Sequence, residues 1–172
     1  MKAELKTSLT MRRTPLGLAG AAGCGILVRR RAYAQSVEGD LAILTAALWL
    51  EHEAIAAYQA GAESGLLSPG VLKVAVAFQT DHKHHRDGII GAIELLGGHA
   101  IGPEHKYTFG RLRTENDILR LAWAREKGAI AAYSTLAANI QNRAVLNFGA
   151  NVLVDDIRHL TVLNSVLGIP NF

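Results

Sequence analysis

Acidic and histidine side chains recur at helical spacing in two related parts of the sequence. Glu51 and Glu126 stand 75 positions apart, and each precedes by seven residues the tyrosine that ends a shared pentapeptide, AIAAY. A histidine-bearing segment follows each copy, DHKHH at 81–85 and DDIRH at 155–159. Seven residues make about two helical turns, so each glutamate shares a helix face with its tyrosine. Carboxylates and imidazoles on apolar helix faces are ligands for divalent transition metals, so the duplication predicts a metal site inside a helical bundle.

The apolar stripe of each segment indicates which of these polar side chains face the interior, because a helix turns about 100° per residue. Glu51 falls inside the stripe of its segment, whereas Glu53 points nearly the opposite way. Glu126 falls inside the stripe of the later copy, and the stripe of the last segment includes Asp156 and His159. We therefore expect both of these glutamates, together with Asp156 and His159, to point into the bundle.

The histidine-bearing segment at 81–85 offers two choices of inward face. Counting in step with the repeat of 75 selects Asp81 and His84, whereas the apolar stripe of residues 71–96 centres between His82 and His85. Burial decides the orientation of a helix, and a loop easily absorbs one residue of slippage, so we predict that His82 and His85 face inward. The predicted metal ligands are then Glu51, His82, His85, Glu126, Asp156 and His159.

A buried hydrogen-bond network without metal is the alternative to this site. Any one buried histidine is usually satisfied by a neighbour, but burying three carboxylates without partners costs much free energy. Six such residues from four segments therefore favour one or two bound ions. Tyr58 and Tyr133 either donate hydrogen bonds near the site or pack in the core, and core packing is the preferred interpretation.

Four segments with helical periodicity position these side chains, at about 39–63, 69–96, 114–140 and 144–167. Ser68-Pro69 marks a helix start, Thr114 with Asp117 forms a variant capping box, and Gly168 follows the last helix. The 15 irregular residues 99–113 exceed a usual helix–helix turn. Extended, they reach roughly 50 Å, which lets the second and third helices run parallel. We predict an all-α four-helix bundle of two helical hairpins with a long crossover between helices 2 and 3.

The basic charge of the chain is concentrated at its start. Residues 1–34 hold seven of the 18 basic residues and one of the 15 acidic residues, so the remainder is net acidic. No basic patch with interleaved aromatic residues follows residue 34, so a nucleic-acid partner is not expected. The domain boundaries that we predict are an export signal at 1–34 and one bundle at 35–172.

The first 34 residues have the pattern of an export signal. Arg12-Arg13 precedes an apolar stretch too short to span a bilayer stably, and Ala32-Tyr33-Ala34 is a small-x-small cleavage pattern. The motif at 10–16 resembles a twin-arginine signal, which predicts a periplasmic protein without a stable membrane span in its mature form. The alternatives are an uncleaved membrane anchor and lipidation at Cys24, the only cysteine.

Residues 37–168 resemble the ferritin-like superfamily, whose bundles take one acid from each of helices 1 and 3 and Glu-x-x-His from helices 2 and 4. Glu51 and Glu126 match the single acids, and Asp156 with His159 matches the last motif, with Asp in place of Glu. The segments LEHEAIAAYQAGAESGLL, VAVAFQTDHKHHRDGI and HLTVLNSVLG are similar to exported bacterial ferritin-like proteins of poorly defined function.

The second helix departs from the superfamily pattern, because His82 stands where a bridging glutamate is expected. Imidazole cannot bridge two metals as a carboxylate does. The site is therefore mononuclear, unequal or degenerate, or Asp81 supplies the carboxylate after a slight rotation of the helix.

The resemblance implies a periplasmic protein that binds iron or manganese, with ferroxidase or peroxide-scavenging activity on O2 or peroxide. It makes Glu51, His85, Glu126 and His159 terminal ligands, Asp156 a bridging ligand and His82 the variable ligand. The alternative is a non-enzymatic or metal-free helical module that acts in stress protection or as a partner of another protein. A homo-oligomer is compatible with either function.

Overall fold

The computed structural model describes residues 19–170, which form four α-helices and no strand. The helices are α1 (Ala19–Glu63), α2 (Pro69–Leu95), α3 (Glu115–Ala137) and α4 (Arg143–Leu167). The chain divides into two compact units, residues 1–35 and 36–172, and the bundle belongs to the second unit. The twin-arginine-like motif at 10–16 lies outside the described residues, as does the side chain of Cys24. The export signal therefore stays a prediction.

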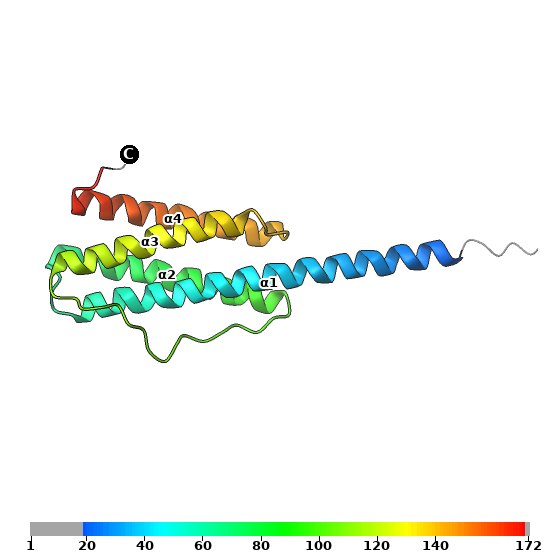
Figure 1. Ribbon diagram of the computed structural model, residues 1–172, viewed down its shortest axis with the longest axis horizontal. Helices are drawn as coiled ribbons and strands as arrows, with labels where there is room; N and C mark the ends of the chain where they lie inside the picture. Colours follow the sequence, from blue (N-terminus) through cyan, green and yellow to red (C-terminus); the bar gives the residue numbers. More distant parts are fainter. Residues whose placement is uncertain (1–18, 171–172) are drawn as a thin grey trace, which may run out of the picture. The chain divides into compact units, whose positions relative to one another are not determined.

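The helices of the bundle form two hairpins, α1–α2 and α3–α4. In Figure 1, α2 and α3 run in the same direction, and the connection between Leu95 and Glu115 passes along the bundle from the end of one to the start of the other. His52 of α1 lies 3.2 Å from the carbonyl oxygen of Ile101, which ties this crossover to α1. The predicted all-α bundle with a long crossover is confirmed.

Local sequence signals account for most helix ends. Ser68 has extended backbone and precedes Pro69, the first residue of α2. Thr114 and Asp117 form a reciprocal capping box, in which each side chain accepts a hydrogen bond from the backbone N–H of the other. Gly168 ends α4 with a φ of 66°, in the left-handed region that glycine adopts without steric cost.

Two predicted boundaries differ from the structure. The first helix begins at Ala19 rather than near Gly39, because no proline interrupts the chain between Pro15 and Pro69. A lone glycine weakens a helix by only about 1 kcal/mol and does not end one. The second difference is the end of α3, which lies at Ala137, a few residues before the predicted end near Ile140.

The bundle interior has two apolar clusters with a polar layer between them. One cluster includes Leu48 of α1, Ile89 of α2 and Val152 of α4. The other includes Ala75 of α2 and Leu163 of α4. Between these clusters along each helix lie six buried side chains, and the packing of both clusters fixes their heights. The six are Glu51, His82, His85, Glu126, Asp156 and His159.

An acid near the start of the bundle portion of each hairpin holds the turn of the other hairpin. Asp40 of α1 is buried, and its two carboxylate oxygens accept hydrogen bonds at 2.8 Å from the backbone N–H groups of Gln141 and Asn142. Glu115 of α3, 75 residues later, accepts one from the backbone N–H of Ser68 at 2.5 Å. The duplication thus extends to the ends of the bundle.

One described stretch, Ala32–Glu63, is long and apolar enough to cross a membrane, judged by length and composition alone. Core helices of soluble bundles and signal sequences meet the same criterion. This stretch contributes the buried Leu44, Leu48 and Glu51 to the bundle. Part of its apolar surface is therefore buried inside the bundle.

Candidate metal centre

The six side chains predicted as metal ligands meet in the polar layer, and all four helices contribute. Each is buried, with at most 6% of its surface exposed: Glu51, His82, His85, Glu126, Asp156 and His159. His84, the alternative from strict repeat counting, is exposed. The apolar stripe of α2 therefore indicated the observed orientation, whereas the role of the six as ligands stays a prediction.

Two overlapping groups within the described residues have the geometry to hold a metal ion. His82, Glu126, Asp156 and His159 form the first group, in which one ligand atom from each residue lies within 4.8 Å of the others. Glu51, His82 and His85 form the second group by the same measure. His82 belongs to both groups. The arrangement therefore offers a four-ligand half and a three-ligand half.

His82 lies between the two buried glutamates. Its Nδ1 is 2.8 Å from Oε2 of Glu51, and its Nε2 is 3.1 Å from Oε1 of Glu126. Burial lowers the pKa of His82, but the hydrogen bonds and charges of the two glutamates outweigh it and raise the pKa well above its ordinary value. Without metal, His82 is therefore an imidazolium that partly neutralises both acids.

The two glutamates also accept hydrogen bonds from buried tyrosines of the opposite hairpin. Tyr58 donates to Oε1 of Glu126, and Tyr133 donates to Oε1 of Glu51, both at 2.5 Å. Both tyrosines also belong to the apolar clusters, so the preferred core packing holds, and the hydrogen bonds add the other predicted role. A signal was present in the sequence, because a buried tyrosine hydroxyl needs a partner and acids were the polar groups at that level.

Two aspartates at the edge of the polar layer contact the outward nitrogens of two histidines. Asp81 of α2 lies 3.2 Å from Nε2 of His159, and Asp155 of α4 lies 3.4 Å from Nε2 of His85. Asp81 is therefore behind a histidine rather than inside either ligand group. A carboxylate in this position fixes the ring and leaves Nδ1 to face the interior.

Five buried atoms of the polar layer have no hydrogen-bond partner among the described residues. They are Nδ1 of His85, Nδ1 of His159, Oε2 of Glu126 and both carboxylate oxygens of Asp156. Nδ1 of His159 approaches Oε1 of Glu126 at 3.4 Å, but without hydrogen-bond geometry. Unpartnered buried polar atoms are costly, and a bound cation is one partner that would satisfy such a group of nitrogen and oxygen atoms.

The charges of the acids depend on their surroundings. Burial raises the pKa of Glu51, but the contacts with His82 and His85 lower it to about 2. Glu126 behaves alike: burial is outweighed by His159 and His82, and its pKa is about 2. Burial and the neighbouring glutamates raise the pKa of Asp156 to about 8. Nδ1 of His85 lies 4.0 Å from Oδ1 of Asp156, and the charges of His82 and His85 offset this rise only in part. Imidazole with carboxylate oxygen fits a divalent ion such as iron or manganese.

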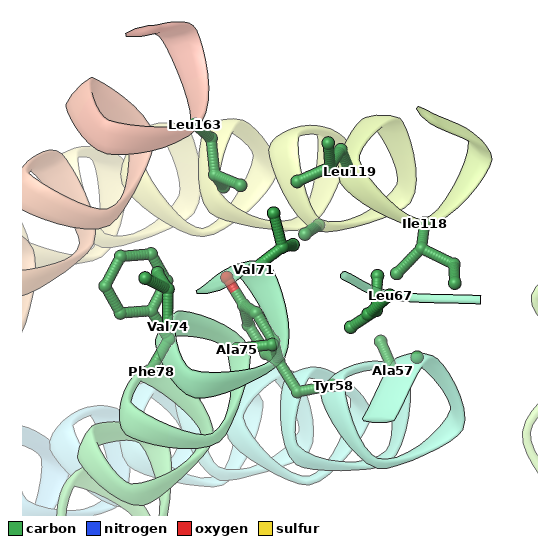
Figure 2. Close-up of a pocket in the computed structure, with 12 residues that line it drawn as sticks. Ala57, Tyr58, Leu67, Val71, Val74, Ala75, Phe78, Ile118, Leu119 and Leu163 are labelled. Atoms are coloured by element: carbon green, nitrogen blue, oxygen red, sulfur yellow. The ribbon is translucent and has the colours of Figure 1, made fainter. Parts of the chain in front are cut away.

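An apolar cavity of about 30 Å³ adjoins the polar layer on the side of the α1–α2 turn (Figure 2). Tyr58 and Phe78 line it, with ring centroids 6.2 Å apart. Phe78 also stacks on the ring of His159, with centroids 3.9 Å apart. The cavity has room for a molecule about the size of water or O2. Its lining side chains Tyr58 and Phe78 contact Glu126 and His159 of the polar layer.

Comparison with solved structures identifies proteins of the same fold. A crystal structure of a conserved hypothetical protein from Mycobacterium tuberculosis is 25% identical, with a TM-score of 0.72 over 80% of this chain and 96% of that chain. A ferritin-like, diiron-carboxylate protein from Bacillus anthracis is 17% identical, with a TM-score of 0.66 over 77% of this chain and 97% of that chain. Among curated proteins, none matches this chain.

A family model for the ferritin-like domain matches residues 39–169. This range begins within α1, ends just after α4 and includes all six residues of the polar layer. The fold and the buried cluster together permit metal binding. With most of the chain matched and the bundle arranged as the family requires, this protein belongs to the ferritin-like domain family.

Proposed function

We propose that this protein is an exported metal-binding protein that holds iron or manganese in the polar layer and has ferroxidase or peroxide-scavenging activity. The observation that carries the proposal is the set of five unpartnered buried atoms on His85, Glu126, Asp156 and His159. A divalent cation in the layer supplies a partner to the unpartnered atoms of Glu126, Asp156 and His159. The diiron-carboxylate description of the Bacillus anthracis protein supports the same class of metal.

Iron or manganese bound in the polar layer would supply one-electron redox chemistry. The acids hold the ion, and the tyrosines and Asp81 orient the ligands around it. The adjoining cavity favours a small uncharged oxidant, O2 or hydrogen peroxide, over an ion. In the ferroxidase reaction with peroxide, two Fe(II) ions each lose one electron. One H2O2 takes up both electrons with two protons and gives two water molecules.

Metal analysis of the exported protein tests the binding. We expect a stoichiometric content of iron or manganese, and a rise in melting temperature when Fe(II) or Mn(II) is added anaerobically to the metal-free protein, because the ion binds only the folded chain. His84→Ala, on the exposed face of α2, is the matched control and retains binding. A metal content far below stoichiometric, with unchanged melting, contradicts the proposal.

Activity is tested by following the oxidation of Fe(II) with O2 and with peroxide. We expect the protein to accelerate one of these reactions, and Asp156→Asn to remove the acceleration, since Asp156 is fully buried and belongs to the four-ligand group. The Asn side chain has nearly the same shape, so circular dichroism should be unchanged. Equal rates of Fe(II) oxidation with and without the protein would contradict the proposed activity but not the proposed metal binding.

Export is tested by cell fractionation. The twin-arginine-like motif predicts that the full chain reaches the periplasm and that replacing Arg12 and Arg13 together with lysine retains it in the cytoplasm. Replacing Cys24 with alanine should leave the location unchanged if lipidation plays no part. A periplasmic protein that depends on Cys24 would instead support the lipidated alternative.

A metal-free bundle that acts in stress protection or as a partner of another protein is the second candidate function. The observation in its favour is His82, whose contacts with Glu51 and Glu126 neutralise two acids without a metal. Under this alternative the protein from the periplasm contains no stoichiometric metal. The same metal analysis therefore separates the two functions.

A further inference from the structure

We infer that the polar layer holds one metal ion per chain, bound by His82, Glu126, Asp156 and His159, and that His82 excludes a second ion. This rests on the proposed function, since it assumes that metal binds. The first line of support is that these four residues form the complete four-ligand group, whereas the other half offers only Glu51 and His85 besides the shared His82. The two halves are therefore unequal before any ion is considered.

The hydrogen bonds of the two glutamates favour the same half. Both oxygens of Glu51 have a partner, with Tyr133 at Oε1 and Nδ1 of His82 at Oε2. Glu126 has both of its partners, Tyr58 and His82, at Oε1, and its Oε2 has none among the described residues. The free carboxylate oxygens of the layer thus belong to Glu126 and Asp156.

The chemistry of imidazole then limits the site to one ion. A neutral imidazole has one nitrogen with a free lone pair and one nitrogen that carries a proton. When Nε2 of His82 binds the ion, Nδ1 keeps its proton and donates it to Glu51 at 2.8 Å. Glu51 becomes a positioning residue that orients His82, as a carboxylate does behind a metal-bound histidine. Binding a second ion through Nδ1 would remove this proton and the hydrogen bond together.

Charge leads to the same conclusion. Two divalent ions carry four positive charges, and the family pattern of four glutamates balances them. The layer has three carboxylates, those of Glu51, Glu126 and Asp156, so two ions would leave one positive charge buried without a partner. One ion leaves a negative excess instead, and the hydroxyl groups of Tyr58 and Tyr133 offset it. His82→Glu restores the fourth carboxylate and should admit the second ion.

The experiment loads the metal-free protein anaerobically with Mn(II) or Fe(II) and measures the ratio of metal to protein. We expect one ion per chain for the natural protein. For His82→Glu we expect two ions, with the exchange-coupled electron paramagnetic resonance signal of a close Mn(II) pair. His84→Glu, which adds the same carboxylate on the exposed face of α2, should keep one ion.

A second pair of variants keeps the test decisive if His82→Glu does not fold. Glu126→Gln should lose the ion, whereas Glu51→Gln should keep one ion, weakened roughly 10-fold as for other groups that orient a ligand. Two coupled ions in the natural protein overturn this inference and leave the proposed function standing. No bound ion overturns both. Equal loss of binding in Glu51→Gln and Glu126→Gln overturns the assignment to the four-ligand half.

Discussion

The hairpins α1–α2 and α3–α4 are two copies of one arrangement, yet they present different groups at the centre of the bundle. Their outer partners correspond, because a tyrosine supports each glutamate and an aspartate lies behind His85 and His159. At the inner position the copies differ, with His82 in the first and Asp156 in the second. The comparison teaches that two duplicated hairpins can keep the same hydrogen-bonding partners around their glutamates and histidines. A difference at one central position then makes their ligand groups unequal.

The ends of the hairpins show the same inequality. Asp40 is buried and accepts two backbone hydrogen bonds from the turn of α3–α4. Its counterpart Glu115 is partly exposed and accepts one such bond from Ser68. The α3–α4 turn is therefore held more firmly than the α1–α2 turn.

Replacing His159 or His85 with alanine gives the largest contrast between the halves. His159 belongs to the four-ligand group, so we expect His159→Ala to weaken metal binding on the order of a thousand-fold, beyond the 10- to 100-fold typical of outer partners. His85→Ala should weaken it only a few-fold. Titration with Mn(II) measures both affinities. Equal losses would indicate that the two halves share the metal.

The charge of Asp156 predicts how the metal-free protein responds to pH. Its pKa rises from the ordinary 3.8 to about 8 in the fold, so the folded chain holds a proton that the unfolded chain releases between these values. The associated stability is fully present below about pH 4 and is lost as the pH rises through about 8. Urea unfolding should show a decline on the order of 6 kcal/mol, since one pKa unit corresponds to about 1.4 kcal/mol.

Asp156→Asn is the matched variant, because it has no titrating carboxyl and should lose this part of the decline. Glu51 and Glu126 act in the opposite direction: their pKa values near 2 give stability that is lost as the pH falls from 4.5 towards 2, in both proteins. The same decline in the natural protein and in Asp156→Asn would exclude Asp156 as its source.

The two turn contacts are compared by Asp40→Ala and Glu115→Ala. Asp40→Ala leaves two backbone N–H groups without their charged partner, and we expect it to lower the free energy of unfolding by about 3 kcal/mol. Glu115→Ala should have a smaller effect, because solvent can replace its exposed contact. Thermal and urea unfolding measure both. A larger effect at Glu115 would reverse the order of the two turns.

The smallest predicted contrast concerns the outer aspartates. Asp81→Asn replaces the charged acceptor at Nε2 of His159 with a neutral amide and should weaken metal binding roughly 10-fold. Asp155→Asn acts behind His85, outside the four-ligand group, and should change the affinity little. Both aspartates are partly exposed, so neither change should prevent folding. A stronger effect at Asp155 would move the metal to the other half.

Much of the candidate site could be predicted from the sequence because inward orientation depends on local periodicity. The apolar stripes of the segments identified Glu51, Glu126 and Asp156 as interior acids. The stripe of α2 selected His82 and His85, although counting by the repeat of 75 residues would have selected other positions. The start of α1 could not be predicted in the same way. No proline marks its start at Ala19, and the backbone of α1 is helical from there through Gly39.

By itself, the sequence determined the helices, the crossover and the inward set of acids and histidines, since caps, breakers and apolar stripes act within one helix. Only the tertiary structure decided the pairs. Glu51 and Tyr58 share a face of α1, yet Tyr58 donates to Glu126 and Glu51 accepts from Tyr133. The physical reason is that hydrogen bonds between side chains depend on distances across the bundle, which packing sets and spacing along one helix does not encode.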